Sequence, residues 1–257
     1  MHDIKYFLTA LAAILVLTGC GGPDRSDSLV VIDAGHGGHD CGALCAGKQE
    51  KELVLQITQR VAKEFRRKGY KVYLTRGKDK FLKLGERTRI ADKMDAKVFI
   101  SIHANAIADK SRFEAVEGIE TYYLQKTRDA RSQKVAAREN ASVLQGTDSL
   151  SKDVIIDSVL NGPKIVESNK LALDVQRGMI KEVKRSYSNV RNGGVKPAPF
   201  YVLVGASRPS ILVEVGYITN AKERKRLFSS EYQKRIAKGI VEGVSRYLDN
   251  RKADIGV

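Results

Sequence analysis

The sequence lacks the features of a fibrous or disordered chain. It has only 5 prolines and an ordinary 22 glycines in 257 residues, and we find no internal repeat and no low-complexity tract. These absences exclude collagen-like and proline-rich disordered chains. With 42% hydrophobic and 29% charged residues, the chain is expected to fold as one globular α/β domain, with little room for a second.

The N-terminal apolar run, from Phe7 to Leu17, is too short to cross a membrane comfortably. It is followed by LTGC, which ends at Cys20. This pattern is typical of a lipoprotein signal peptide over residues 1–19, with Cys20 as the acylated N-terminus and residues 20–27 as a tether. An ordinary cleaved signal and a short membrane anchor are the alternatives. Gly21 stands where inner-membrane retention would favour aspartate, so we expect the outer membrane if the organism has one.

Acidic residues are outnumbered, since 30 Asp and Glu stand against 45 Lys and Arg and give a net charge of +15. Such a balance can indicate nucleic-acid binding. However, no recognised motif interleaves aromatic with basic residues, and export to the periplasmic face of the cell envelope argues against a nucleic-acid partner. An anionic envelope polymer, a lipid surface or simply a soluble basic surface are the remaining interpretations.

Strand-like and helix-like segments alternate along residues 28–250. The pattern predicts a three-layer sandwich with a mostly parallel central sheet and helices on both faces. Residues 126–167 are polar and contain two helix-like fragments, 136–144 and 152–160, so we interpret them as an insertion near the site. The predicted strands are 29–33, 70–75, 97–103, 118–124, 200–205 and 210–216. Predicted helices begin at Glu50, Leu84 and Ser168, and a stripe of apolar residues over 232–248 predicts a C-terminal helix.

Three predicted strands deliver a histidine or a carboxylate at or near their C-terminal ends, where ligands bind in open α/β sheets. His36 follows the first strand in a glycine-rich loop, His103 ends another, and Glu214 lies in the last. His36, Glu50 and His103 would form a catalytic zinc set, because three protein ligands leave one tetrahedral position open. His39, in the same loop as His36, is expected to be a solvated loop residue.

Glu214 lies among apolar neighbours in SILVEVG. An unpaired buried charge costs roughly several kcal/mol, so a cationic group should face this carboxylate. A water network at a zinc ion would meet that need, and a salt bridge with Arg87 or Arg208 is the structural alternative.

Four motifs occur in the order DAGHGG at 33–38, Glu50 followed by Lys51, SIHAN at 101–105 and VEVGYITN at 213–220. Together they resemble the zinc-dependent N-acetylmuramoyl-L-alanine amidases of the amidase_3 type, over nearly all of residues 28–249. The resemblance implies Zn²⁺ at His36, Glu50 and His103, with Glu214 as the catalytic acid/base. It also implies hydrolysis of the amide between N-acetylmuramic acid and L-alanine in peptidoglycan, as in cell-wall remodelling and daughter-cell separation.

The chain departs from the family pattern in two segments. Cys41 and Cys45 lie between two of the proposed ligands and are either a short-loop disulfide or free thiols. Residues 126–167 look short for the autoinhibitory helix that some divisome-regulated relatives place near the site, so we expect constitutive activity or control by localisation, and no activator is identified. The rival functions are a non-catalytic peptidoglycan-binding domain and a zinc carboxypeptidase acting on stem peptides.

Overall fold

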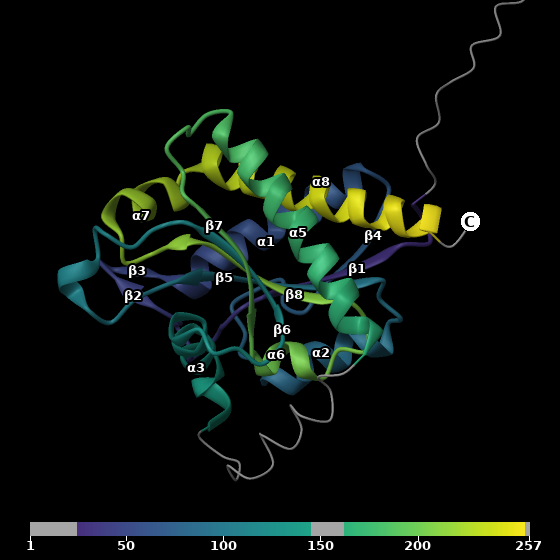
Figure 1. Ribbon diagram of the computed structural model, residues 1–257, viewed down its shortest axis with the longest axis horizontal. Coiled ribbons are helices and arrows are strands. Elements are labelled where there is room, and N and C mark those ends of the chain that lie inside the picture. Colours follow the sequence, from purple (N-terminus) through teal and green to yellow (C-terminus); the bar gives the residue numbers. More distant parts are fainter. Residues whose placement is uncertain (1–24, 145–161, 255–257) are drawn as a thin grey trace, which may run out of the picture.

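The computed structural model describes residues 25–144 and 162–254, and its centre is a six-stranded sheet (Figure 1). The strands are β1 (Leu29–Ala34), β4 (Lys71–Leu74), β5 (Val98–Asn105), β6 (Ile119–Leu124), β7 (Asn192–Ala198) and β8 (Ser210–Tyr217). Their order is β4-β1-β5-β8-β6-β7. All neighbouring pairs are parallel except β6 with β8, so the predicted mostly parallel sheet is confirmed.

Helices cover both faces of this sheet, which confirms the three-layer α/β fold (Figure 1). One face carries α1 (Glu50–Arg67), α5 (Pro163–Lys184) and α8 (Ser230–Asp254). The other carries α2 (Leu84–Lys93), α3 (Ala130–Leu144) and α6 (Tyr201–Val204). The short helices η1 (Lys110–Arg112) and α7 (Ala221–Leu227) and the hairpin β2 (Leu44–Cys45) and β3 (Lys48–Gln49) complete the described elements. No helix in the described ranges is long and apolar enough to cross a membrane.

Helix α1 forms where apolar side chains recur every three or four residues, because that spacing puts them on one helical face. Leu53, Ile57, Val61 and Phe65 follow this spacing and are fully buried against the sheet. The helix begins at Glu50, as predicted. Its packing therefore fixes the position of the Glu50 side chain at the edge of the sheet.

Two predictions about the C-terminal half are wrong. The segment FYVLVG is the helical turn α6, and the strand is β7, whose sequence NGGVKPA has no apolar alternation. Glycine and proline are tolerated in β7 because it is an edge strand that pairs only with β6. Helix α5 begins at Pro163 rather than at Ser168, whose buried hydroxyl instead accepts a hydrogen bond from the backbone of Ser210.

Three neighbouring strands place polar side chains in one row across the sheet. His103 on β5 lies opposite Glu214 on β8, which lies opposite Glu120 on β6. Residues two positions earlier or later on these strands, Leu212 and Tyr122, belong to the hydrophobic cluster beneath α2, α3 and α6. Since side chains alternate between faces, the whole row faces those helices.

Candidate metal centre

The backbone around His36 is held by two buried arginines. His36 has a left-handed conformation with φ of 58°, which is uncommon for a residue other than glycine. Arg87 donates to the carbonyls of Ala34 (2.7 Å) and His36 (2.9 Å), and Arg76 donates to the carbonyl of Gly35 (2.7 Å). These bonds satisfy the carbonyls of the turn and fix the direction in which His36 leaves β1.

Gly35 allows the two histidines to meet. A Cβ atom at this position would lie 2.3 Å from the ring of His103, so any other residue would displace that ring. The imidazoles of His36 and His103 consequently lie with their centroids 4.8 Å apart and their planes at 76°. The glycine directly after β1 is thus a requirement of the site.

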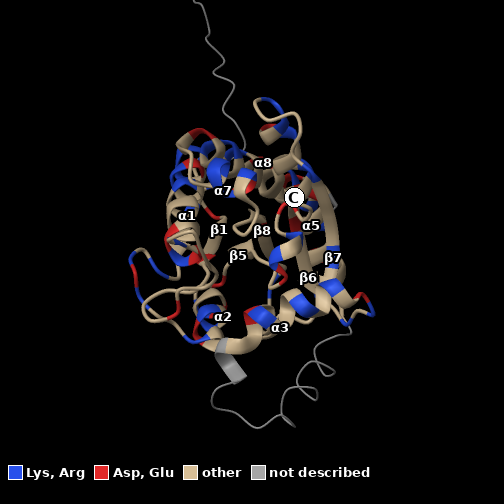
Figure 2. Cartoon of the chain, turned by 90° about the vertical axis from the view of Figure 1, so that its left-hand side faces the viewer, with Lys and Arg blue, Asp and Glu red and all other residues tan. Residues whose placement is uncertain are grey.

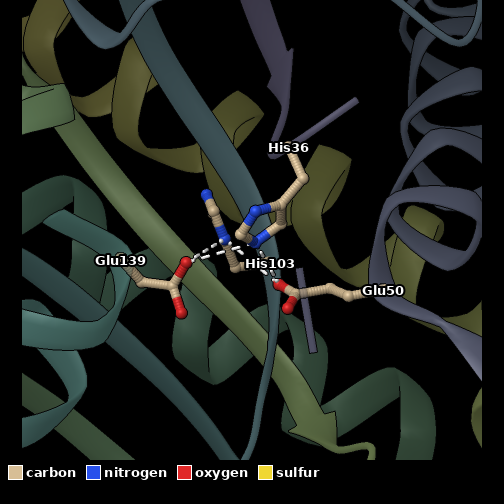
Figure 3. A group of neighbouring side chains, drawn as sticks. All are labelled: His36, Glu50, His103 and Glu139. Atoms are coloured by element: carbon tan, nitrogen blue, oxygen red, sulfur yellow. Dashed lines mark hydrogen bonds and ion pairs between the residues drawn. The ribbon is translucent and has the colours of Figure 1, made fainter. Parts of the chain in front are cut away.

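Four side chains converge at the carboxyl ends of β1 and β5 (Figure 3). His36 Nε2 lies 3.1 Å from Glu50 Oε1 and 3.2 Å from Glu139 Oε2. His103 Nδ1 lies 3.2 Å and 3.0 Å from the same two oxygens. One ligand atom from each residue lies within 4.8 Å of all the others. The structure therefore brings together the predicted His36, Glu50 and His103 and adds Glu139.

These contacts fit a bound metal ion. A tetrahedral zinc ion with nitrogen or oxygen ligands at about 2.0–2.2 Å has its ligand atoms about 3.3–3.6 Å apart, slightly more than the contacts seen here. His36 Nε2 and Glu139 Oε2 are also buried without a hydrogen-bond partner, although buried polar atoms are normally satisfied. A cation at the centre of the four side chains would satisfy both atoms.

The charges of the cluster also favour a cation. Burial lowers the pKa of His103, but the Glu139 and Glu50 carboxylates outweigh burial and raise that pKa to about 9. For His36, burial lowers the pKa, but the charge of Glu50 and the hydrogen bond from His36 Nδ1 to the Asp40 carboxylate outweigh burial and raise the pKa well above its usual value. The two carboxylates thus create a negative site whose charge a divalent cation would balance.

Residues around the cluster orient the proposed ligands. Asp40 Oδ2 lies 3.0 Å from His36 Nδ1, which leaves Nε2 facing the cluster. The two oxygens of Glu50 accept hydrogen bonds of 2.9 Å from the backbone of Ala104 and Ala43. Strand β5 and the loop before α1 therefore hold the three proposed ligands, His36, Glu50 and His103, in place.

Glu214 lies next to the cluster as a fully buried carboxylate. Its Oε2 has no hydrogen-bond partner, and its Oε1 is 3.5 Å from Arg138 Nη2. Burial raises its pKa well above the usual value and Glu139 adds to the effect, although Arg138 opposes it. The alternative pairings are wrong, because Arg87 pairs with Asp33 and Arg208 with Asp95.

Helix α3 lies within residues 126–167, the segment interpreted as an insertion near the site, and it brings Glu139 into the cluster. The predicted fragment 136–144 belongs to α3, whereas the fragment 152–160 lies outside the described residues. Glu139 is only 6% exposed although it lies in a polar segment, AAREN. The only signal in the sequence was the pair Arg138–Glu139 among small residues, since nothing local reveals that this face docks on the sheet.

Two arginines attach α3 to the row of polar residues on the sheet. Arg138 donates to Asn105 Oδ1 (3.1 Å), and Arg131 donates to the hydroxyl of Tyr217 (2.5 Å) and lies 3.2 Å from Glu120. The two are seven residues apart, which is about two helical turns, so they share one face of α3. Figure 2 looks onto this edge of the sheet, where Lys and Arg residues appear on α2, α3 and α7.

The remaining loop residues lie outside the four-residue cluster. His39 is exposed and packs its ring on Phe81, with centroids 4.1 Å apart, which agrees with its predicted place in the loop. Cys41 and Cys45 are free thiols. Cys20 lies outside the described residues.

Comparisons with known proteins indicate the family of this chain. The family model of N-acetylmuramoyl-L-alanine amidase (Amidase_3) matches residues 30–246. The Escherichia coli K12 amidase AmiA is 33% identical over 88% of this chain and 78% of its own length. An N-acetylmuramoyl-L-alanine amidase structure from Clostridium difficile 630 is 30% identical, with a TM-score of 0.67 over 88% of this chain and 100% of that one. AmiC2 of Nostoc punctiforme is 32% identical, with a TM-score of 0.62 over 88% and 99%.

Proposed function

The chain belongs to the N-acetylmuramoyl-L-alanine amidase family, and on that premise we propose that it is a zinc hydrolase that cleaves the amide between N-acetylmuramic acid and L-alanine in peptidoglycan. The observation that carries the proposal is the convergence of His36, Glu50 and His103 beside the buried Glu214. Two imidazoles and a carboxylate are the donor set of many catalytic zinc sites. Cell-wall remodelling, including daughter-cell separation, is the process that we propose for this reaction.

The residues divide the chemistry between them. His36, Glu50 and His103 would hold the zinc ion, which when bound polarises a carbonyl and lowers the pKa of water to about 7. Glu214 takes a proton from the attacking water and delivers it to the departing nitrogen of L-alanine. Its burial supports this role, because a raised pKa makes the carboxylate a better base than an exposed glutamate.

Mass spectrometry of purified peptidoglycan digested by the protein tests this function. We expect whole stem peptides with a free L-alanine amine and glycan strands without peptide. Peptides that are shortened at their C-terminus but still joined to the sugar would indicate a carboxypeptidase instead. An absence of any cleavage together with retained peptidoglycan binding would indicate a non-catalytic binding domain.

The ligand assignment predicts how zinc content responds to substitution. His36→Ala and His103→Ala should each lose most of the bound zinc, because each removes one of three core ligands. His39→Ala is the matched control, since its ring contacts Phe81 outside the cluster, and it should keep its zinc. Elemental analysis of the purified variants measures this. Zinc that persists in His36→Ala but is lost from His39→Ala would contradict the assignment.

We also propose that the protein is held at the periplasmic face of a membrane by a lipid on Cys20. Arg25, the first described residue, pairs with Asp249 near the end of α8. In Figure 1 the C-terminal end of α8 lies at the opposite end of the sheet from α3 and the β2–β3 hairpin. A tether leaving there would let the candidate site face away from the membrane.

Replacing Cys20 should separate attachment from activity. Cys20→Ser should move the protein from the membrane fraction to the soluble fraction, because the lipid can no longer be attached. Its rate on purified peptidoglycan should remain that of the wild type, since Cys20 lies outside the candidate site. Immunoblots of fractionated cells give the first result, and a variant that stays with the membranes would show that another anchor holds it.

A further inference from the structure

A cavity of about 390 Å³ lies beside the proposed metal centre. Its lining includes His39 and Asp40 of the loop after β1, Phe81, and Arg138, Glu139 and Ala141 of α3. His36 and Glu50 also line it. Its volume falls within the range of about 300–1,000 Å³ that is usual for small-molecule sites.

The position of this cavity assigns it to one half of the substrate. Its lining includes His36 and Glu50 but neither His103 nor Glu214. Along the sheet edge, His36 follows β1, His103 lies on β5 and Glu214 lies on β8, in the order of the strands. Arg138 of α3, which contacts Glu214, also lines the cavity, whereas the wall with His39 and Phe81 follows β1 and β4 and lies on the side of the cluster away from Glu214.

This placement separates the acyl half of the amide from the amine half. Under the proposed function, on which this inference rests, Glu214 protonates the leaving nitrogen, so the stem peptide lies on the Glu214 side. The acyl half, which carries the sugar, must then extend from the cluster in the other direction. That direction leads into the cavity.

The cavity wall offers an aromatic surface. The rings of His39 and Phe81 lie 4.1 Å apart at an angle of 37°. Sugar rings present a face of C–H groups that packs against aromatic rings, and their hydroxyls and amides need polar partners. Asp40, whose side chain is 24% exposed, supplies carboxylate oxygens at the same wall.

Side chains behind the wall keep the two rings in place. Lys51 Nζ donates to the carbonyl of Gly38 and to Asp79 Oδ2, both at 2.8 Å, and Asp79 Oδ1 accepts from the backbone of Gly38 at 2.7 Å. These bonds join the loop that carries His39 to the segment that carries Phe81. A preorganised surface of this kind loses less conformational entropy when a ligand binds.

We propose that His39 and Phe81 form the subsite for the N-acetylated muramyl sugar ring of the substrate. The test compares a muramyl peptide with a lactyl peptide that has the same scissile amide but no sugar ring. Phe81→Ala should lower kcat/KM on the muramyl peptide roughly tenfold, which corresponds to the loss of one aromatic contact. The same variant should cleave the lactyl peptide at the wild-type rate.

Matched variants separate the subsite from a general defect. Tyr73→Ala removes an aromatic side chain that is 41% exposed on the edge strand β4, and it should change neither rate. His39→Ala, at an exposed position, should also lower kcat/KM on the muramyl peptide alone, without affecting folding. If Phe81→Ala is unstable, Phe81→Leu replaces it, because leucine keeps apolar volume at this position. Equal losses on both substrates, or none on either, would overturn the proposal.

A binding measurement distinguishes failure of the subsite from failure of the proposed function. Titration calorimetry with N-acetylmuramic acid should show binding to the wild type and at least a severalfold weaker affinity for His39→Ala and Phe81→Ala. If the wild type cleaves neither amide, the proposed reaction fails while the sugar titration still decides whether the subsite exists. If both amides are cleaved and the sugar binds all variants equally, only the subsite is wrong.

Discussion

Replacing Glu214 with glutamine is expected to lower kcat by roughly 10²–10⁴-fold while the protein keeps its fold and its metal. Glutamine preserves the shape of the side chain but cannot accept the proton of the attacking water. Glu214 has one oxygen without any hydrogen-bond partner and only a 3.5 Å contact with Arg138, so the fold depends little on its charge. Thermal melts, zinc content and release of stem peptides should be measured on the same preparation.

The control for this experiment is a buried carboxylate far from the cluster. Glu182 on α5 is 1% exposed and contacts Arg185 and Arg235. Glu182→Gln leaves these arginines without their partner, so it should lower the melting temperature while turnover per folded molecule stays normal. A Glu214→Gln protein that behaves in this way, melting early yet turning over normally, would show that Glu214 is structural.

Removing the carboxylate of Glu139 should have the opposite effect and increase activity. Glu139 Oε2 lies 3.2 Å from His36 and 3.0 Å from His103 and so is the fourth donor of the cluster, whereas a catalytic zinc site keeps its fourth position for water or substrate. Close pairs of opposite charge contribute roughly 1.5–3 kcal/mol, so the loss of these ion pairs in Glu139→Ala should favour the undocked helix by about 10–100-fold. The initial rate of stem-peptide release should rise by up to that factor.

An exposed residue on the same helix provides the comparison. Lys134→Ala alters α3 without touching the cluster and should leave the rate unchanged. A Glu139→Ala protein that loses zinc and activity together would show instead that Glu139 is a required ligand of the active enzyme. Unchanged activity would show that α3 does not block the site, which is what the expectation of constitutive activity from the sequence requires.

Much of the fold could be predicted because its core segments carry their own pattern. The apolar stripe of α1 and the buried runs of β1, β5 and β8 are local signals, and they placed His36, Glu50, His103 and Glu214 near one another. Strand β7 could not be found, because an edge strand needs no apolar alternation and tolerates Pro197.

The other missed features depend on contacts between distant residues. Arg76 and Arg87 hold the turn at His36 through backbone carbonyls, which leave no trace in a sequence motif. Glu139 reaches the histidines only because Arg131 and Arg138 dock α3 across three strand ends. The residue spacing of a helix predicts which of its faces is polar. It does not predict on which part of the protein that face packs.

The shared position of Glu139 has a thermodynamic consequence. A zinc ion bound by His36, Glu50, His103 and Glu139 together would link metal affinity to helix docking, and such linkage is reciprocal. If docking of α3 raises the metal affinity by a given factor, metal binding raises the equilibrium constant for docking of α3 by the same factor. A chelator should therefore make α3 more sensitive to proteolysis, and an agent that pulls α3 away should make the ion easier to remove. Metal supply in the envelope would then set how firmly the enzyme is kept closed.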